Sequence, residues 1–413
     1  MIPLQANMRG LSRDDAMSRS DTNTSRSPLI IVTSEMRATG ETGVQTHFND
    51  AIDYFRKSKC RVEFVGPDES RSRYHHLRIP RGLLARLIPF VPEFAFSLLR
   101  SIDIYATRRE LRRRLSGEAS WCVYAQDPVT ARAALGLKCS SSHRVVLAVH
   151  FNKSQAEEMV NRGVIRRDGK LYQRIRLEEI FVLQGVDHVI AFSSFMRTSL
   201  LAQASIEEKI SVIPNTAHMP RPLSPSESLM AADLVAVGSL EPRKNQAFLL
   251  HVLASAKERG RCYTLDLIGS GESQVALERL AEDLGISSQV HFLGRVTPAS
   301  SYLQGHTLFV HAALMENMPI ALIEALAVGL PILAPAIGGI PEIFQHGVEG
   351  YFWDLENLAY STQLLIRLME DDQMRKKMSA AAQQRHADYL SPAIVFARLA
   401  EAIQGRNERS AIE

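Results

Sequence analysis

Residues 316–324 read Glu316-Asn-Met-Pro-Ile-Ala-Leu-Ile-Glu324, and they are the most informative stretch of the chain. Two carboxylates bracket an apolar run that predicts the start of a helix. At about 3.6 residues per turn, positions eight apart lie about two turns apart along the axis and about 80° from eclipsed. The pattern therefore places Glu316 in the loop before the helix and Glu324 inside it.

The residues that follow extend this pattern into a longer string. Ala325-Leu-Ala-Val-Gly-Leu-Pro-Ile332 comes next, followed later by Gly338-Gly-Ile-Pro-Glu342. Taken in order, the string resembles the Glu-x7-Glu signature and trailing Gly-Gly-x-Pro-Glu loop of the retaining glycosyltransferases of family 4. The resemblance covers most of residues 230–350 well, whereas residues 28–215 share only scattered short matches.

Short apolar runs alternate with helical stretches along the whole chain. Predicted strands occupy residues 29–33, 60–65, 120–125, 145–149, 186–192, 210–213, 234–237, 265–268, 290–293 and 307–310. Strands that alternate with helices of about 10–15 residues predict parallel sheets with helices on both faces. We therefore expect an α/β protein with two doubly wound, Rossmann-like domains that face each other across a cleft, the B-type fold of the resembled family. Ligands would bind at the carboxyl ends of the strands.

A segment with four prolines, residues 214–225, is typical of a linker between the two halves. It divides an N-terminal domain, residues 28–218, from a C-terminal domain, residues 226–390. The resemblance assigns the acceptor to the first domain and the nucleotide-sugar donor to the second. Residues 1–27 are rich in Ser, Arg, Asp and Asn and lack an apolar core, which predicts a disordered leader. In the resembled family the last helix, within residues 391–413 here, crosses back to the first domain.

The composition is that of an ordinary globular protein, but its charge is uneven. The 413 residues are 46% hydrophobic and 23% charged, with a formal net charge of +3. Residues 1–220 carry 32 Lys and Arg against 23 Asp and Glu, and the remainder carries 16 against 22. A basic first half suggests that it meets an anionic surface or acceptor. Four distant cysteines without a Cys-x-x-Cys pair favour the reducing cytosol over a disulfide framework or a zinc knuckle.

Two adjacent cations, Arg243 and Lys244, follow a predicted strand and precede a predicted helix. A helix amino terminus favours anions, an arginine can fork onto phosphate oxygens, and a lysine adds a point charge. An isolated Arg-Lys pair is better explained as a solvated loop edge. The resemblance assigns both to the donor diphosphate. The assignment of Lys244 is the firmer, because many family members place the arginine directly after the glycine, where this chain has Ser239.

The resemblance also assigns the two carboxylates of the opening string. Glu324 would bind the ribose hydroxyls of the nucleotide, and Glu316 would hold hydroxyls of the transferred sugar. Backbone N–H groups at the start of the helix, including those of Ile320 and Ala321, would receive the distal phosphate as its bond to the sugar breaks. Arg295 follows another predicted strand and is expected to line the nucleotide pocket.

Two residues of the first domain are further candidates. His150 ends the predicted strand 145–149, where an α/β cleft places its working groups, and in the resembled family a histidine here contacts the sugar and its phosphate. Gly43 resembles the second glycine of the family's Gly-Gly-Val loop, although two residues separate the glycines here. It would let the backbone approach a phosphate or acceptor closely, and a plain turn explains it nearly as well. His47, on the first predicted helix, is not expected to be catalytic.

The sequence contains no Asp-x-Asp triplet and no Gly-x-x-x-x-Gly-Lys-Ser/Thr loop. The first is the metal site of the other main glycosyltransferase architecture, and the second marks a P-loop nucleotidase. We therefore expect no cofactor and no metal, with protein cations and helix ends supplying the electrostatic stabilisation.

Residues 71–114 hold eleven arginines and three acids, interleaved with apolar residues. Such a segment can attach to anionic lipid, at about 1 kcal/mol for each basic residue near the surface. A solvated helix face is an equal alternative, and no module for nucleic acid is present. The longest apolar stretch, residues 83–99, is interrupted by charges and prolines, which argues against a conventional membrane-spanning helix.

The resemblance thus implies a retaining enzyme that moves a hexose from a nucleotide-diphosphate sugar to a glycan, lipid-linked or small-molecule acceptor, in polysaccharide or glycoconjugate biosynthesis. The expected location is the cytoplasm, with possible peripheral attachment to the inner face of the membrane. Two alternatives remain: a binding protein that kept the fold and lost activity, and another enzyme of this architecture such as an epimerase or phosphorylase. The candidate residues Lys244, Glu316, Glu324 and His150 argue against an inactive protein.

Overall fold

The computed structural model describes residues 27–40, 42–71, 92–161, 163–220, 232–296 and 299–405. Nearly all of the predicted leader, linker residues 221–225, residues 72–91 of the basic segment and the last eight residues lie outside this range.

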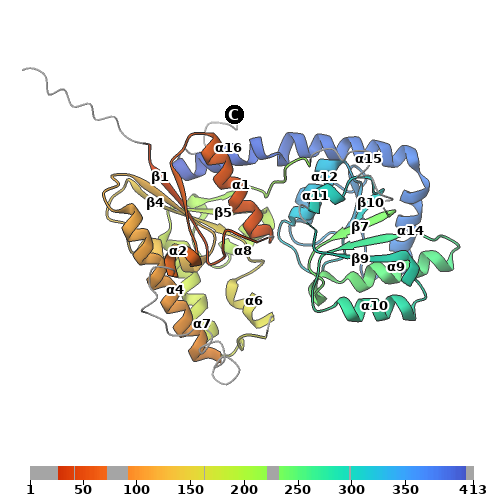
Figure 1. Ribbon diagram of the computed structural model, residues 1–413, viewed down its shortest axis with the longest axis horizontal. Coiled ribbons are helices and arrows are strands. Elements are labelled where there is room, and N and C mark those ends of the chain that lie inside the picture. The colour runs from red at the N-terminus through yellow and green to blue at the C-terminus, as the bar shows by residue number, and fades with distance from the viewer. Residues whose placement is uncertain are drawn as a thin grey trace, which may run out of the picture.

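The structure confirms two doubly wound domains, each built on a six-stranded parallel sheet (Figure 1). The first sheet has the order β2-β1-β3-β4-β5-β6 and the second the order β12-β11-β10-β7-β8-β9. The strands of the first sheet are β1 (Leu29–Thr33), β2 (Val62–Val65), β3 (Trp121–Ala125), β4 (His143–Val149), β5 (His188–Ala191) and β6 (Ile210–Val212). Those of the second are β7 (Leu234–Val237), β8 (Leu265–Ile268), β9 (Val290–Gly294), β10 (Leu308–Val310), β11 (Ile332–Pro335) and β12 (Gly350–Trp353).

The strand order reverses at one place in each sheet. In the first sheet, β2 and β3 pair with opposite edges of β1. In the second sheet, β8 and β10 pair with opposite edges of β7, so the order reverses between β7 and β10. Such a switch point opens a crevice at the carboxyl ends of the strands, because successive helices leave toward opposite faces. Both crevices are therefore candidate ligand sites.

Helices cover both faces of each sheet, which explains why the central strands are predominantly apolar and almost wholly buried. The helices of the first domain are α1 (Gly43–Lys57), α2 (Pro67–Arg71), α4 (Pro92–Leu115), α5 (Pro128–Leu135), α6 (Gln155–Asn161), α7 (Lys170–Gly185) and α8 (Ser194–Leu201). Those that follow are α9 (Gln246–Glu258), α10 (Gln274–Asp283), α11 (Ala299–Tyr302), α12 (Ile320–Val328), α13 (Ile340–Ile343), α14 (Leu358–Glu370), α15 (Asp372–Arg385) and α16 (Pro392–Gln404).

The last helix runs along one side of the molecule from the second domain to the first (Figure 1). Arg398 of α16 donates to the carbonyl of Val212 at 2.8 Å, and Arg144 of β4 donates to the carbonyl of Ala402 at 3.3 Å. These long-range hydrogen bonds hold α16 on the first sheet.

The beginning of the predicted linker is packed between the domains. Asn215 donates to the carbonyl of Met318 at 2.8 Å, and Thr216 donates to the carbonyl of Leu390 at 2.6 Å. Both side chains are buried. Both side chains thus satisfy carbonyl groups of the second domain, because a buried carbonyl needs a donor.

Candidate functional site

The switch point of the second sheet brings a cation and a carboxylate together. Lys244 follows β7, Glu316 follows β10, and these strands are neighbours although the two residues are 72 positions apart. The Lys244 Nζ atom is hydrogen bonded to Glu316 Oε1. Arg243 Nη1 and His311 Nε2 lie 3.7 and 3.4 Å from the same oxygen. Glu316 is thus a buried carboxylate within a basic cluster.

This cluster decides the ionisation of Glu316. Burial by itself raises the pKa of a carboxyl group, but Lys244, His311 and Arg243 together lower the pKa of Glu316 to about 2. Burial lowers the pKa of His311, so its imidazole is neutral at pH 7. The site therefore presents a permanent carboxylate beside two permanent cations. His311 was missed by the sequence reasoning, because a lone histidine at a strand end carries no distinguishing pattern.

The Gly-Gly-x-Pro-Glu loop supports the backbone of Glu316. A Cβ atom on Gly338 would lie 1.7 Å from the Glu316 carbonyl oxygen, and one on Gly339 would lie 1.9 Å from that of Asn317. Gly338 also has φ +53°, a left-handed conformation that favours glycine. Only residues without a side chain permit this approach, so the two glycines set the position of the loop that carries Glu316.

The same loop ties the domains together. Both carboxylate oxygens of Glu342 accept backbone N–H groups at the start of α8, from Ser194 at 2.7 Å and from Phe195 at 3.0 Å. A carboxylate is favourable there because the first N–H groups of a helix lack partners within the helix. Ser193 donates to Asn317 Oδ1 at 2.6 Å, which adds a second link across the cleft.

The amino terminus of α12 faces the first domain, and no side chain caps it. Ile320 and Ala321 form its first positions, and a Cβ atom built on Gly43 would lie 3.5 Å from Ile320 Cδ1. Gly43 and the start of α12 therefore meet across the cleft. One turn later, the half-buried Glu324 has its pKa raised to about 7, by burial and by the charge of Asp50 on α1.

His150 lies beside the cleft at the carboxyl end of β4. Its Nε2 atom is 2.9 Å from Gln126 Oε1, and its ring centroid is 4.6 Å from that of Phe192 and 5.4 Å from that of His47. Burial, with a contribution from His47, holds the pKa of His150 well below its ordinary value, so the imidazole is neutral. His47, expected to have no catalytic role, is buried against His150 and lies 2.8 Å from the Tyr124 hydroxyl. Because Phe192 precedes Ser193, the Ser193–Asn317 hydrogen bond places His150 near the loop that carries Glu316.

Arg295 lies at the carboxyl end of β9 and is exposed. Its Nε atom donates to Ser270 Oγ at 2.9 Å, which joins the loops after β8 and β9. These loops continue the edge that carries Lys244, since β7, β8 and β9 are neighbours. Within the described ranges, no cluster of three or more His, Cys, Asp or Glu side chains is arranged to hold a metal ion.

Two family models match this chain. "Glycosyltransferase Family 4" matches residues 42–218, and "Glycosyl transferases group 1" matches residues 226–385. Together with the two six-stranded sheets, these two family models define the B-type, two-domain class of glycosyltransferases. The chain belongs to glycosyltransferase family 4.

Individual relatives are distant. A GDP-mannose-dependent phosphatidylinositol monomannoside mannosyltransferase from Mycolicibacterium smegmatis is 29% identical over 42% of this chain and 48% of its own length. Among solved structures, Anabaena HepE in complex with UDP-glucose has a TM-score of 0.66 at 17% identity, covering 91% of this chain and 100% of HepE. Sucrose-phosphate synthase from Thermosynechococcus elongatus has a TM-score of 0.71 at 13% identity, covering 91% of this chain and 98% of that one. The first curated relatives are matched over 31% to 61% of their length.

Proposed function

We propose that this protein is a retaining glycosyltransferase that moves a hexose from a nucleotide-diphosphate sugar without a metal ion. The observation that carries the proposal is the cluster at the β7/β10 switch point, where Lys244 and Arg243 surround the buried carboxylate of Glu316. A cation pair suits a diphosphate, and a permanent carboxylate suits sugar hydroxyls. The complex of HepE with UDP-glucose supports a donor of this class.

The proposed roles follow from position. Lys244, Arg243 and the uncapped start of α12 bind the diphosphate and stabilise the charge that develops as it departs. Glu316 holds hydroxyls of the transferred sugar, and Glu324 accepts hydrogen bonds from the ribose. His150, a neutral imidazole, contacts the sugar from the opposite side of the cleft.

For retention, we propose attack on the face from which the diphosphate leaves. The bond between the anomeric carbon and the phosphate oxygen breaks, and a bond to the acceptor oxygen forms on the same side. The acceptor proton passes to the departing phosphate oxygen. This route requires no nucleophilic side chain of the protein.

The test is nucleotide release from a panel of UDP, GDP and ADP sugars, with the anomeric configuration of the product read by NMR. Release from one donor with retained configuration supports the proposal. An inverted product refutes the mechanism. Tight binding of a nucleotide sugar without turnover in the presence of any acceptor would favour an inactive binding protein, and conversion of the donor to a different nucleotide sugar would favour an epimerase.

We further propose that the acceptor is a glycan, a lipid-linked sugar or a small molecule, and that the protein works in the cytoplasm with peripheral attachment to an anionic membrane. Tyr105, Arg109 and Arg112 are exposed at helical spacing on α4, which supports such a surface. Arg113 and Arg114 form ion pairs with the buried Glu110, at 2.7 and 2.9 Å.

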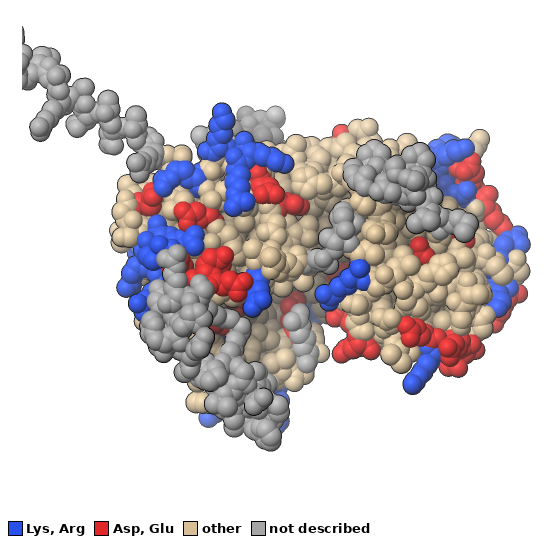
Figure 2. All heavy atoms as spheres, viewed as in Figure 1, with Lys and Arg blue, Asp and Glu red and all other residues tan. Residues whose placement is uncertain are grey.

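Figure 2 shows basic and acidic side chains interleaved on the visible face of the first domain. No helix in the described part of the chain has both the length and the apolarity to cross a membrane.

A further inference from the structure

A second polar cluster lies at the switch point of the first sheet, between β1 and β3. Glu35 follows β1 and Asp127 follows β3, and the backbone N–H of Glu35 donates to Asp127 Oδ2 at 2.8 Å. The other oxygen of Asp127 accepts from the Thr130 N–H at 2.8 Å and caps α5. Asp127 is thus occupied by the backbone, whereas the carboxyl group of Glu35 takes no part in this turn.

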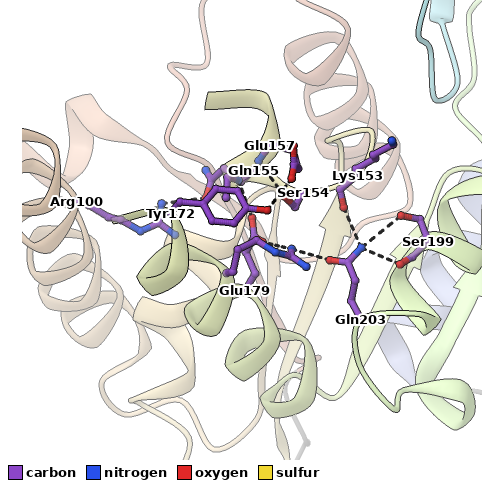
Figure 3. Close-up of polar contacts among 11 residues, drawn as sticks. Arg100, Lys153, Ser154, Gln155, Glu157, Tyr172, Glu179, Ser199 and Gln203 are labelled. Atoms are coloured by element: carbon purple, nitrogen blue, oxygen red, sulfur yellow. Dashed lines mark hydrogen bonds and ion pairs between the residues drawn. The ribbon is translucent and has the colours of Figure 1, made fainter. Parts of the chain in front are cut away.

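Arg100 reaches the cluster from α4. Its side chain is only 7% exposed, and it donates to Glu178 Oε2 and to Gln155 Oε1, each at 2.9 Å. Figure 3 shows the Arg100 side chain extending toward Gln155, the first residue of α6. Among the described residues, its remaining nitrogen, Nη2, is buried and has no hydrogen-bond partner. A buried N–H group without an acceptor is rare in folded proteins and needs an explanation.

Glu35 is also incompletely satisfied. Its half-buried carboxyl group has one hydrogen bond within the described residues, a long contact of 3.5 Å from Gln155 Nε2. Burial and the charges of Asp127 and Asp103 raise the pKa of Glu35, against the opposing effects of Arg100 and Gln155, to about 8. At neutral pH it is therefore a protonated carboxyl group that can both donate and accept.

The position of these groups connects them to the transfer reaction. Gln126, the residue before Asp127, lies 2.9 Å from His150, so the cluster adjoins the histidine at the cleft. The loop that begins at Glu35 leads to Gly43, which meets α12 across the cleft. A ligand at Glu35 would thus lie on the first-domain side of the transferred sugar.

We propose that Glu35, Arg100 and Gln155 form an acceptor subsite that holds a neutral, hydroxyl-rich unit, a sugar or polyol, in preference to a phosphorylated one. This inference rests on the proposed function. A hydroxyl group can accept from the unused Arg100 N–H and donate to Glu35, which satisfies both groups. A phosphate would instead lie near the carboxyl groups of Asp103, Asp127 and Glu178, with the one guanidinium of Arg100 to balance them. That excess of carboxyl groups disfavours an anion.

The test compares neutral methyl hexopyranosides with hexose 6-phosphates, as stimulators of nucleotide release and in saturation-transfer NMR without donor. We expect stimulation and binding with the neutral glycosides. Glu35→Ala should raise the KM for the acceptor about 3- to 10-fold, as the loss of one hydrogen bond predicts, and leave release to water unchanged. Glu35→Gln should behave like the wild type at pH 7, since an amide resembles a protonated carboxyl group. Above pH 8 the wild type should weaken and this variant should not.

Glu157→Gln is the matched control. It neutralises a carboxylate of α6, the helix that begins at Gln155. The Glu157 Oε1 atom accepts from the Tyr172 hydroxyl at 2.6 Å (Figure 3). It should leave acceptor KM and binding unchanged. Equal or better stimulation by the phosphates, an unchanged KM in Glu35→Ala, or no binding of any neutral glycoside would overturn the subsite. Glycoside binding that depends on Glu35, in a protein that releases nucleotide from no donor, would keep the subsite and refute the proposed transferase.

Discussion

Replacing Lys244 by alanine tests the assignment of the donor site most directly. In the structure Lys244 is largely buried and bonded to Glu316, and no second lysine joins this cluster within the described residues. On the proposed assignment, the variant removes one charge-assisted hydrogen bond to the diphosphate, which costs about 1.5–3 kcal/mol, or about 10- to 150-fold in Kd. It also leaves Glu316 with Arg243 and His311 alone. A less compensated carboxylate beside the diphosphate moves the expected loss toward the upper end of that range.

The change should also alter acid stability. The folded-state pKa of Glu316, about 2, lies below its unfolded value, so Glu316 contributes stability above the unfolded pKa. This contribution is lost as pH falls through the folded pKa. Without Lys244 the folded pKa rises, so the contribution above the unfolded pKa becomes smaller and is lost at a higher pH. We therefore expect Lys244→Ala to unfold at a higher pH than the wild type on acid titration.

The assay is calorimetric titration with the nucleoside diphosphate of the active donor, beside acid unfolding followed by circular dichroism. Lys257→Ala is the control, because Lys257 is an exposed lysine of the same domain that donates to the carbonyl of Gly285. Unchanged nucleotide affinity in Lys244→Ala, or a loss no larger than in Lys257→Ala, would refute the assignment of Lys244 to the diphosphate.

Four further outcomes are expected. Glu316→Ala should reduce turnover far more than affinity for the bare nucleoside diphosphate; the reverse pattern, measured by kinetics and calorimetry, contradicts a sugar-binding role. EDTA should leave activity intact. Activity that EDTA abolishes and that Mg²⁺ or Mn²⁺ restores would show that the mechanism needs a metal. Gly339→Ala should destabilise the fold by about 1–3 kcal/mol in urea titration and reduce turnover, because its Cβ would displace the Asn317 carbonyl; wild-type stability would rule out the proposed support. The protein should float with anionic liposomes at low salt. Added salt should reduce this flotation, and so should a variant with Arg109 and Arg112 both changed to Glu. Equal flotation with neutral lipid would leave α4 as a solvated face.

Local patterns were sufficient for most of the secondary structure and for part of the site. Periodicity located the first ten strands but missed β11 and β12. The spacing of Glu316 and Glu324 correctly separated a loop residue from one inside α12, which begins at Ile320. The ion pairs of Arg113 and Arg114 with Glu110 could also have been predicted from the sequence, since the arginines lie three and four positions after Glu110 on one helix.

The partners of the site residues were decided by tertiary structure alone. Lys244 meets Glu316 because β10 lies beside β7, and the apolar character of two strands does not specify which strands pair. In the same way, the helical periodicity around His47 predicts that one face of α1 is buried. It does not predict that the His47 ring packs against His150. Glu342 and the start of α8 meet only when the domains face each other. Glu35 and Arg100 acquire their chemistry from burial and from neighbours on other elements. A sequence pattern reports which face of an element is buried, and the fold determines what it is buried against.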